Sequence, residues 1–171
     1  MSMLSPGYGD TVVVRAAEAE KLGVPPNTMR LIADGDVTSH ALGTHLISLG
    51  PGTDGAPPHH HDRSSELFFV VDGSVDLLCG EELVTAERHD VVIVPPRTPH
   101  AFGASAGRTA ELLVVVAPGV ERFPYFRGLF ELATGTGSLE QVLEIGRRCD
   151  TFIADASGWQ ALRAASREER R

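Results

Sequence analysis

Short apolar runs, separated by turn-forming residues, recur along the chain before residue 118. The runs are rich in β-branched and aromatic residues, and pairs such as Asp72-Gly73 and Cys79-Gly80 mark turns between them. A β-rich piece covers residues 11–14, and one or two helical turns are expected at 16–22. The strands expected from this pattern span residues 29–34, 42–49, 66–71, 74–78, 82–86, 91–94, 100–102 and 110–116. Many short strands without long intervening helices predict an all-β antiparallel sandwich or barrel.

The pattern changes after Pro118-Gly119, where apolar residues recur at helical spacing. One helix is expected over residues 121–133, a second follows a capping-box sequence that begins at Ser138, and a third begins near Ser157. These helices carry too little apolar material to fold alone, so we expect them to pack on the barrel. The predicted organisation is a flexible leader, a β-barrel domain and a C-terminal helical extension, at residues 1–10, 11–118 and 119–171.

Three of the expected strands are apolar on both faces, at residues 67–71, 91–94 and 112–116. An antiparallel strand with one wet face should instead alternate apolar and polar residues. Some other part of the structure must therefore cover the outer face of the sheet. The C-terminal helices can cover part of it, and a second copy of the chain is the expected cover for the rest. The sequence thus predicts a homodimer.

Composition limits the possible partners and the compartment. The chain has 171 residues, a formal net charge of −8 and a pI near 5.3, which argue against nucleic acid and anionic membrane surfaces as partners. No signal peptide and no apolar run of membrane-spanning length is apparent. Cys79 and Cys149 are isolated and suggest no disulfide framework. A cytoplasmic protein that binds a small molecule is the expectation.

The spacing of four residues with metal-binding side chains indicates a metal site. These residues are His59, His61, Glu66 and His100. Residues two apart on an extended strand point to the same face, so His59 and His61 can reach one ion. Glu66 opens an apolar run, and His100 follows a proline-rich turn. Three imidazoles and one carboxylate suit one divalent transition metal, such as Fe, Mn, Ni, Co, Cu or Zn, better than calcium or magnesium.

The other histidines are not expected to be direct ligands. His60 points away from the face shared by its two neighbours, and His40 and His89 lie outside the spacing. His45 is a candidate for facing a substrate cavity. The plain alternative for the histidine cluster is a solvated polar loop, but that alternative leaves unexplained why a glutamate begins an apolar strand.

The same residues resemble the two motifs of the cupin superfamily. The first motif is matched by His59, His61, Glu66 and Gly73, and the second by Pro95 and His100. Three positions of the second motif differ: His89 and Arg97 stand in place of glycines, and Ala104 in place of asparagine. The opening glycine of the first motif is also out of register, with Thr53 in its place. Because histidine tolerates a left-handed backbone comparatively well, we expect His89 to make the turn. The resemblance covers residues 40–118 and implies a jelly-roll barrel, the cupin double-stranded β-helix.

The resemblance implies a metal in the mouth of the barrel, with a coordination position left open to water or substrate. Glu66 is expected to act as a general base as well as a ligand, because burial in an apolar barrel raises the pKa of a carboxyl group. Aromatic residues of the first helix, Phe123, Tyr125 and Phe126, are candidates for a lid, although core packing is the favoured role for at least two of them. The predicted substrate pocket is formed by Phe68, Val70, Phe102 and His45.

Three functions compete. The first is a metal-dependent dioxygenase, an oxidoreductase acting on a small phenolic or enolisable substrate, which the similarity to quercetinase-like cupins with C-terminal helices favours. The second is a cyclase, isomerase or epimerase in which the metal only polarises a carbonyl group. The third is a small-molecule-binding protein without catalysis. The ligand set is the same for the first two, so the residues alone leave them open.

Overall fold

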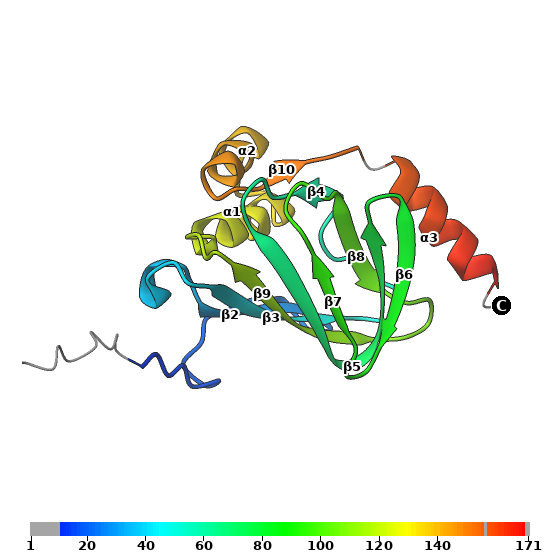
Figure 1. Ribbon diagram of the computed structural model, residues 1–171, viewed down its shortest axis with the longest axis horizontal. Helices are drawn as coiled ribbons and strands as arrows, with labels where there is room; N and C mark the ends of the chain where they lie inside the picture. The colour runs from blue at the N-terminus through cyan, green and yellow to red at the C-terminus, as the bar shows by residue number, and fades with distance from the viewer. Residues whose placement is uncertain (1–10, 156, 170–171) are drawn as a thin grey trace, which may run out of the picture.

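The computed structural model describes residues 11–155 and 157–169, and the expected leader at 1–10 lies outside the described residues. Antiparallel strands form a curled, barrel-like structure, and three helices follow them (Figure 1). The strands are β1 Lys21–Val24, β2 Asn27–Ala33, β3 Gly43–Leu49, β4 His59–His60, β5 Ser65–Cys79, β6 Glu82–Glu87, β7 Val91–Val94, β8 His100–Ala104, β9 Ala110–Ala117 and β10 Phe152–Ile153. A 3-10 turn spans Asp36–Thr38, and the helices are α1 Phe123–Ala133, α2 Leu139–Arg148 and α3 Ser157–Glu169. The expected all-β jelly roll with C-terminal helices is confirmed.

The strands pair into two sheets that share β5. One sheet runs in the order β1-β2-β3-β9-β5-β7, and the other joins β6, β5, β8, β4 and β10. The turn predicted at Asp72-Gly73 is wrong, because β5 continues through it as one strand of 15 residues. A register shift between Val70 and Asp72 bends the strand there instead. Gly73 makes the bend possible: it has φ +81°, and a Cβ at this position would lie 2.0 Å from the carbonyl oxygen of Thr109.

The N-terminal predictions also need correction. Residues 11–14 form no strand, and 16–22 form no helix: a turn at 16–18 is followed by β1, which begins at Lys21. A segment this short makes at most one or two helical turns, which are marginal in water without packing partners. The end of this segment pairs instead in the hairpin of β1 with β2, where Lys21 lies opposite Arg30 and Leu22 opposite Met29.

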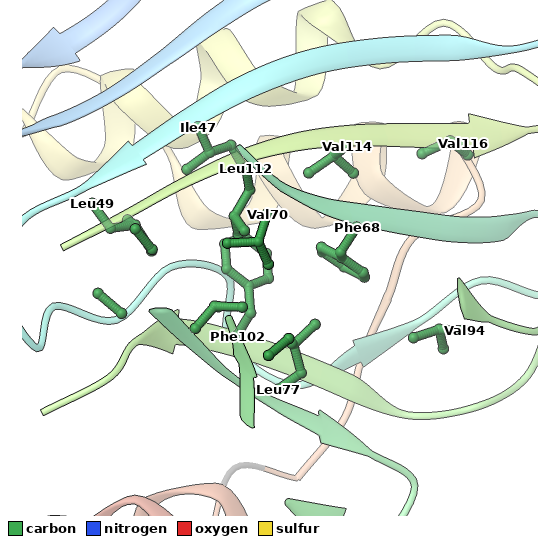
Figure 2. Packing of buried hydrophobic residues seen from close by; sticks show 14 residues of the cluster. Ile47, Leu49, Phe68, Val70, Leu77, Val94, Phe102, Leu112, Val114 and Val116 are labelled. Atoms are coloured by element: carbon green, nitrogen blue, oxygen red, sulfur yellow. The ribbon is translucent and has the colours of Figure 1, made fainter. Parts of the chain in front are cut away.

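The core lies between the two sheets and is built from inward-facing positions of alternating strands. On β9, Leu112 and Val114 are completely buried while their neighbours are partly exposed. Figure 2 shows Val70 beside Leu112, its partner on the neighbouring strand, with Leu77 on the other side of the interior. This packing closes the middle of the barrel, so a cavity can open only toward one end.

The helices cover two different regions. Helix α3 lies along β6 and β8 (Figure 1), and its Trp159 packs on Leu78 and Ala101. Helices α1 and α2 pack together near β10 through Tyr125, Val142 and Cys149. None of the helices in the described residues is long and apolar enough to cross a membrane.

The outer face of β7 is left uncovered by the described part of this chain. Val91 is 52% exposed and Ile93 is 62% exposed. The homodimer predicted from strands that are apolar on both faces therefore stays a proposal, with β7 as a place where a second copy would pack.

Candidate metal centre

The four predicted ligands meet at one end of the barrel. His59 belongs to β4 and pairs in register with His100, the first residue of β8. His61 directly follows β4, and Glu66 is the second residue of β5. All four side chains are buried, and one ligand atom from each lies within 4.8 Å of the others. Pairing of β4 with β8 thus brings together residues that are up to 41 positions apart in the sequence, His59 and His100.

Backbone carbonyl groups fix the orientation of all three imidazole rings. The Nδ1 atom of His59 lies 2.9 Å from the carbonyl oxygen of Pro57, and that of His100 lies 2.9 Å from Thr98 O. The Nδ1 atom of His61 lies 2.6 Å from the carbonyl oxygen of Asp150. A carbonyl can only accept a hydrogen bond, so each Nδ1 carries the hydrogen and each Nε2 keeps its lone pair.

These Nε2 lone pairs converge on one oxygen of Glu66. The distances to Oε2 are 3.8 Å from His59, 3.1 Å from His61 and 2.7 Å from His100. Acceptor atoms packed this closely are well placed to share one cation. A buried set of three imidazole nitrogens and one carboxylate oxygen, with the far nitrogens held by carbonyl groups, fits a divalent transition metal. The cluster could hold such an ion, and its chemistry does not single out one metal.

Burial and neighbouring side chains together set the charge of two residues at this site. Burial is the largest influence on His59, whose pKa is lowered to about 3, and the nearby His100 acts in the same direction. His59 is therefore neutral, as a metal ligand must be. Burial also acts to raise the pKa of Glu66, but the interactions with His100 and His61 outweigh it and bring the pKa well below its ordinary value. The raised pKa expected for Glu66 is wrong, since burial alone does not decide it.

The remaining histidines lie elsewhere. His60 stacks on Phe152, with ring centroids 5.3 Å apart, and its Nε2 is 3.4 Å from Asp62 Oδ1. His40 contacts the carbonyl oxygen of Gly119 through Nδ1. His89 takes φ 76°, the left-handed turn expected of it.

Arg97, at the second motif position where a glycine is expected, is also left-handed, with φ 65°. Its backbone N–H donates to the carbonyl oxygen of His61 across 2.6 Å. The turn before β8 is therefore tied directly to a ligand residue, although it lacks the glycine.

A cavity of about 400 Å³ opens beside the cluster. Its polar end contains His59, His61 and Glu66, and its wall is largely apolar. The apolar wall comes from β1, β2, β3 and α1 and includes Leu22, Met29, Ile47, Leu129, Phe130 and Ala133. Two of the predicted pocket residues, His45 and Phe102, line this cavity.

The other two predicted pocket residues, Phe68 and Val70, do not line the cavity. Both are completely buried deeper in the barrel, where inward-facing residues of β5 meet the opposite sheet. The ring of Phe68 lies 5.4 Å from that of Phe102 and 6.1 Å from that of His100, centroid to centroid. Phe68 thus supports the site from below.

The lid candidates divide in the same way. Tyr125 and Phe126 line the cavity, and the ring of Phe126 lies 4.7 Å from that of His45. Phe123 is not part of the lining. Burial, the largest influence, lowers the pKa of His45 to about 4, so His45 presents a neutral ring to the cavity.

Sequence reasoning missed Asp150, which clamps the loop between two ligands. Its carboxylate accepts backbone N–H groups from Asp62, Arg63 and Ser64, at 3.0, 3.1 and 3.0 Å. Its carbonyl group orients His61. Burial acts to raise the pKa of Asp150, but these three hydrogen bonds lower it below its ordinary value. The only local signal is an aspartate just after a predicted helix, which does not reveal a partner 88 residues earlier.

Arg122 was also missed. Its backbone N–H and that of Phe123 donate to the two carboxylate oxygens of Asp34, at 2.7 and 3.1 Å, which fixes the start of α1. The guanidinium group lines the cavity beside the ligands, with Nη1 3.9 Å from Glu66 Oε1. The C-terminal extension therefore contributes to the site itself.

The fold and the site define a β-barrel protein with a buried histidine and glutamate centre at its mouth. Residues 45–116 match the family model described as "Cupin domain", a segment that contains all four residues of the cluster. The matched segment is thus similar to the cupin domain family, and the chain has the cupin fold. No curated protein matches it in sequence.

Solved structures share this fold. A variant of Streptomyces PAC13 with uridine is 21% identical, with a TM-score of 0.54 over 67% of this chain and 87% of that chain. The polyketide cyclase RemF from Streptomyces resistomycificus is 18% identical, with a TM-score of 0.53 over 69% of this chain and 94% of that one. A predicted oxalate decarboxylase from Thermotoga maritima is 18% identical, with a TM-score of 0.54 over 62% and 98%. At these identities the similarity shows the fold.

Proposed function

We propose that this protein is a metal-dependent enzyme that acts on a small, largely apolar molecule through an enolate or phenolate oxygen. The observation that carries the proposal is one polar end in an otherwise apolar cavity, formed by ligands with converging lone pairs. Such a cavity can bury the body of a substrate and direct one oxygen toward the metal. A bound metal would act as a Lewis acid that makes the neighbouring O–H or C–H group more acidic.

Glu66 is the proposed proton acceptor. Its Oε2 atom faces His61 and His100, whereas Oε1 lies on the side of Arg122. Oε1 is therefore the oxygen that can take a proton from a substrate in the cavity. The lowered pKa keeps Glu66 ionised and ready to accept, and it also means that the substrate must first be acidified.

The first candidate reaction is a dioxygenase reaction on a phenolic or enolisable substrate, as the similarity to quercetinase-like cupins implies. The second is a reaction without oxygen, such as cyclisation, isomerisation or epimerisation. The names of the structural neighbours favour the second, because they include a polyketide cyclase and a nucleoside dehydratase. The same residues serve both: the four ligands would hold the metal that activates the substrate oxygen, and Glu66 would move the proton.

One experiment separates these candidates. The protein is loaded in turn with Fe²⁺, Mn²⁺, Co²⁺, Ni²⁺ and Zn²⁺, and a panel of flavonols, catechols and 1,3-diketones is followed by oxygen uptake and by mass spectrometry. Oxygen uptake matched to substrate loss supports the dioxygenase. Substrate conversion that proceeds equally in anaerobic buffer supports the cyclase or isomerase. If no loaded form converts any of the panel, a binding protein becomes the better description.

A further inference from the structure

Arg122 is a buried cation with almost nothing to accept its hydrogen bonds. Its residue surface is 5% exposed, and its Nε atom has no hydrogen-bond partner among the described residues. Its Nη1 atom lies 3.9 Å from Glu66 Oε1, which is beyond hydrogen-bonding distance. Its Nη2 atom lies 3.0 Å from His61 Nδ1, but that nitrogen already gives its hydrogen to the carbonyl oxygen of Asp150. A donor cannot serve as the acceptor for Nη2.

A second buried arginine shows what a structural guanidinium looks like in this protein. Arg163 on α3 is 3% exposed, and its nitrogens donate to the carboxylates of Asp54 and Asp76 and to the carbonyl oxygens of Gly52 and Ala104. Buried charges are normally paired and hydrogen-bonded in this way, since leaving them without acceptors is costly. Arg122 departs from this pattern inside the cavity, where a ligand can supply the missing acceptor.

Hydrogen bonds hold the backbone at Arg122, so its side chain starts from a fixed point beside the cavity. Asp34 accepts the N–H groups of Arg122 and Phe123, and Arg122 itself begins the first turn of α1 through its carbonyl group. Side chains on anchored elements recognise ligands with less loss of conformational freedom. The backbone end of the Arg122 side chain is therefore fixed before any ligand arrives, and burial limits the space open to its guanidinium group.

The charge at the polar end of the cavity depends on the metal. Of the lining side chains, Arg122 and Glu66 carry opposite charges and His45 is neutral. A divalent cation held by the cluster would therefore make this pocket net positive within its apolar wall, in a protein whose net charge is −8. Such a pocket favours an anionic group on an otherwise apolar molecule.

We infer that Arg122 recognises a carboxylate or other anionic oxygen of the substrate, next to the metal centre. This inference rests on the proposed function, because it names the substrate class for the same cavity: small apolar acids, with the acidic group at the Arg122 end and the apolar body against β2, β3 and α1. An arginine donates two hydrogen bonds to a planar oxygen pair, which a lysine cannot do. Arg122 is thus the residue that sets specificity for the anion.

The test compares two probes of the same shape. Calorimetry measures the binding of 2-naphthoate and of its neutral counterpart 2-naphthamide to the zinc-loaded protein. We expect the parent protein to bind naphthoate more tightly by roughly 10- to 100-fold, because a hydrogen-bonded ion pair is made only with the acid. Arg122→Met should bring the two affinities within about threefold of each other. The control Arg147→Gln removes the same charge from an exposed position on α2 and should keep the preference.

A second measurement distinguishes recognition from a structural role. In metal-free protein without ligand, Arg122→Met should unfold at the same temperature as the parent protein or higher, since it removes a poorly paired buried charge. Arg163→Met should lower the unfolding temperature. A large loss of stability in Arg122→Met would show that the residue serves the fold, and would overturn the inference.

Zinc content measured on the same samples separates the two ways of failing. A parent protein that retains no zinc contradicts the proposed function. A parent protein that retains zinc but binds both probes equally, or binds neither, contradicts the role of Arg122 while the metal centre stands. An Arg122→Met variant that still prefers naphthoate contradicts it as well.

Discussion

The carbonyl oxygen of Asp150 accepts the Nδ1 hydrogen of His61 across 2.6 Å, although the two residues are 89 positions apart. The carboxylate of the same aspartate holds the backbone of residues 62–64. One residue of the C-terminal extension therefore fixes both the ring of a predicted metal ligand and the loop that leads to the next one, Glu66. A hydrogen-bond acceptor at the far ring nitrogen of a metal-binding histidine orients the ring and raises the basicity of the nitrogen that faces the metal.

Replacing Asp150 should weaken both the fold and the metal centre. Asp150→Asn keeps a residue that tolerates the left-handed backbone, φ 60°, but loses the charge that accepts three N–H groups. We expect a loss of about 1–3 kcal/mol in the free energy of unfolding, measured in urea. Zinc affinity should fall by about 10- to 100-fold, measured by competition with a chelator. Asp72→Asn, at an exposed site, is the control, and an equal effect there would contradict the prediction.

The contribution of Asp150 should depend on pH in one direction. Its pKa in the folded protein is below the ordinary value of 3.8, so the ionised carboxylate stabilises the fold above that pH. As the pH falls through the folded-state pKa, this stabilisation is lost. The difference in stability between the parent protein and Asp150→Asn should thus be constant near neutral pH and shrink below 3.8. A difference that grew on acidification would have the wrong sign.

The four-residue cluster should be the site that retains metal. His61→Ala and His100→Ala each remove one of the converging Nε2 lone pairs, so their metal content after brief chelation should fall well below that of the parent protein. His60→Ala is the matched control, because His60 stacks on Phe152 outside the cluster and should keep its metal. Full retention by both ligand variants, or loss by His60→Ala, would contradict the assignment; elemental analysis decides it.

Glu66→Gln should affect turnover more than metal occupancy. The amide oxygen can still serve as a ligand, but it cannot take a proton from the substrate. We expect turnover to fall by about 100-fold or more once an active substrate is found, while metal content falls much less. Glu82→Gln, at the exposed start of β6, should change neither. Intact turnover in Glu66→Gln would leave Glu66 as a ligand only.

The protein should be a homodimer through the face that contains β7. Val91 and Ile93 are exposed there, on a strand with no covering helix in the described part of the chain. Light scattering should give a mass of about twice 18.3 kDa for the parent protein and a mass near the monomer for Ile93→Glu. Leu139→Glu places the same charge at an exposed apolar position of α2 and should stay dimeric. A monomeric parent protein at micromolar concentration would contradict the prediction.

Local pattern was enough to predict most strands and all three helices, because burial on one face imposes a periodicity that can be read directly. The alternation along β9 is an example. It was not enough for β5, where Gly73 can support either a turn or a bend and only the pairing with β9 selects the bend. Ser138 precedes α2 as expected but makes no capping hydrogen bond through its side chain, so the helix starts there for other reasons.

In the candidate site, too, local spacing predicted some residues, and others depend on contacts between distant parts of the chain. The four clustered residues were predictable because motif spacing fixes which residues share a strand face. Arg122, Asp150 and the packing depth of Phe68 were not, because they depend on how the C-terminal extension and the opposite sheet are placed in space. The distance along the chain from Arg122 to His61 is 61 residues, and no periodicity extends that far.

The two-residue strand β4 is held on one side by β8 and on the other by β10, which is among the last parts of the described chain. A growing polypeptide that has reached residue 118 already contains His59, His61, Glu66 and His100 but has neither β10 nor Asp150. All four clustered residues are then present, but the strand β10 that pairs with β4 has not yet been made. We therefore expect the four side chains to be aligned only after residues 150–153 have been made, and a chain that stops before them would carry all four without the contacts that hold them in place.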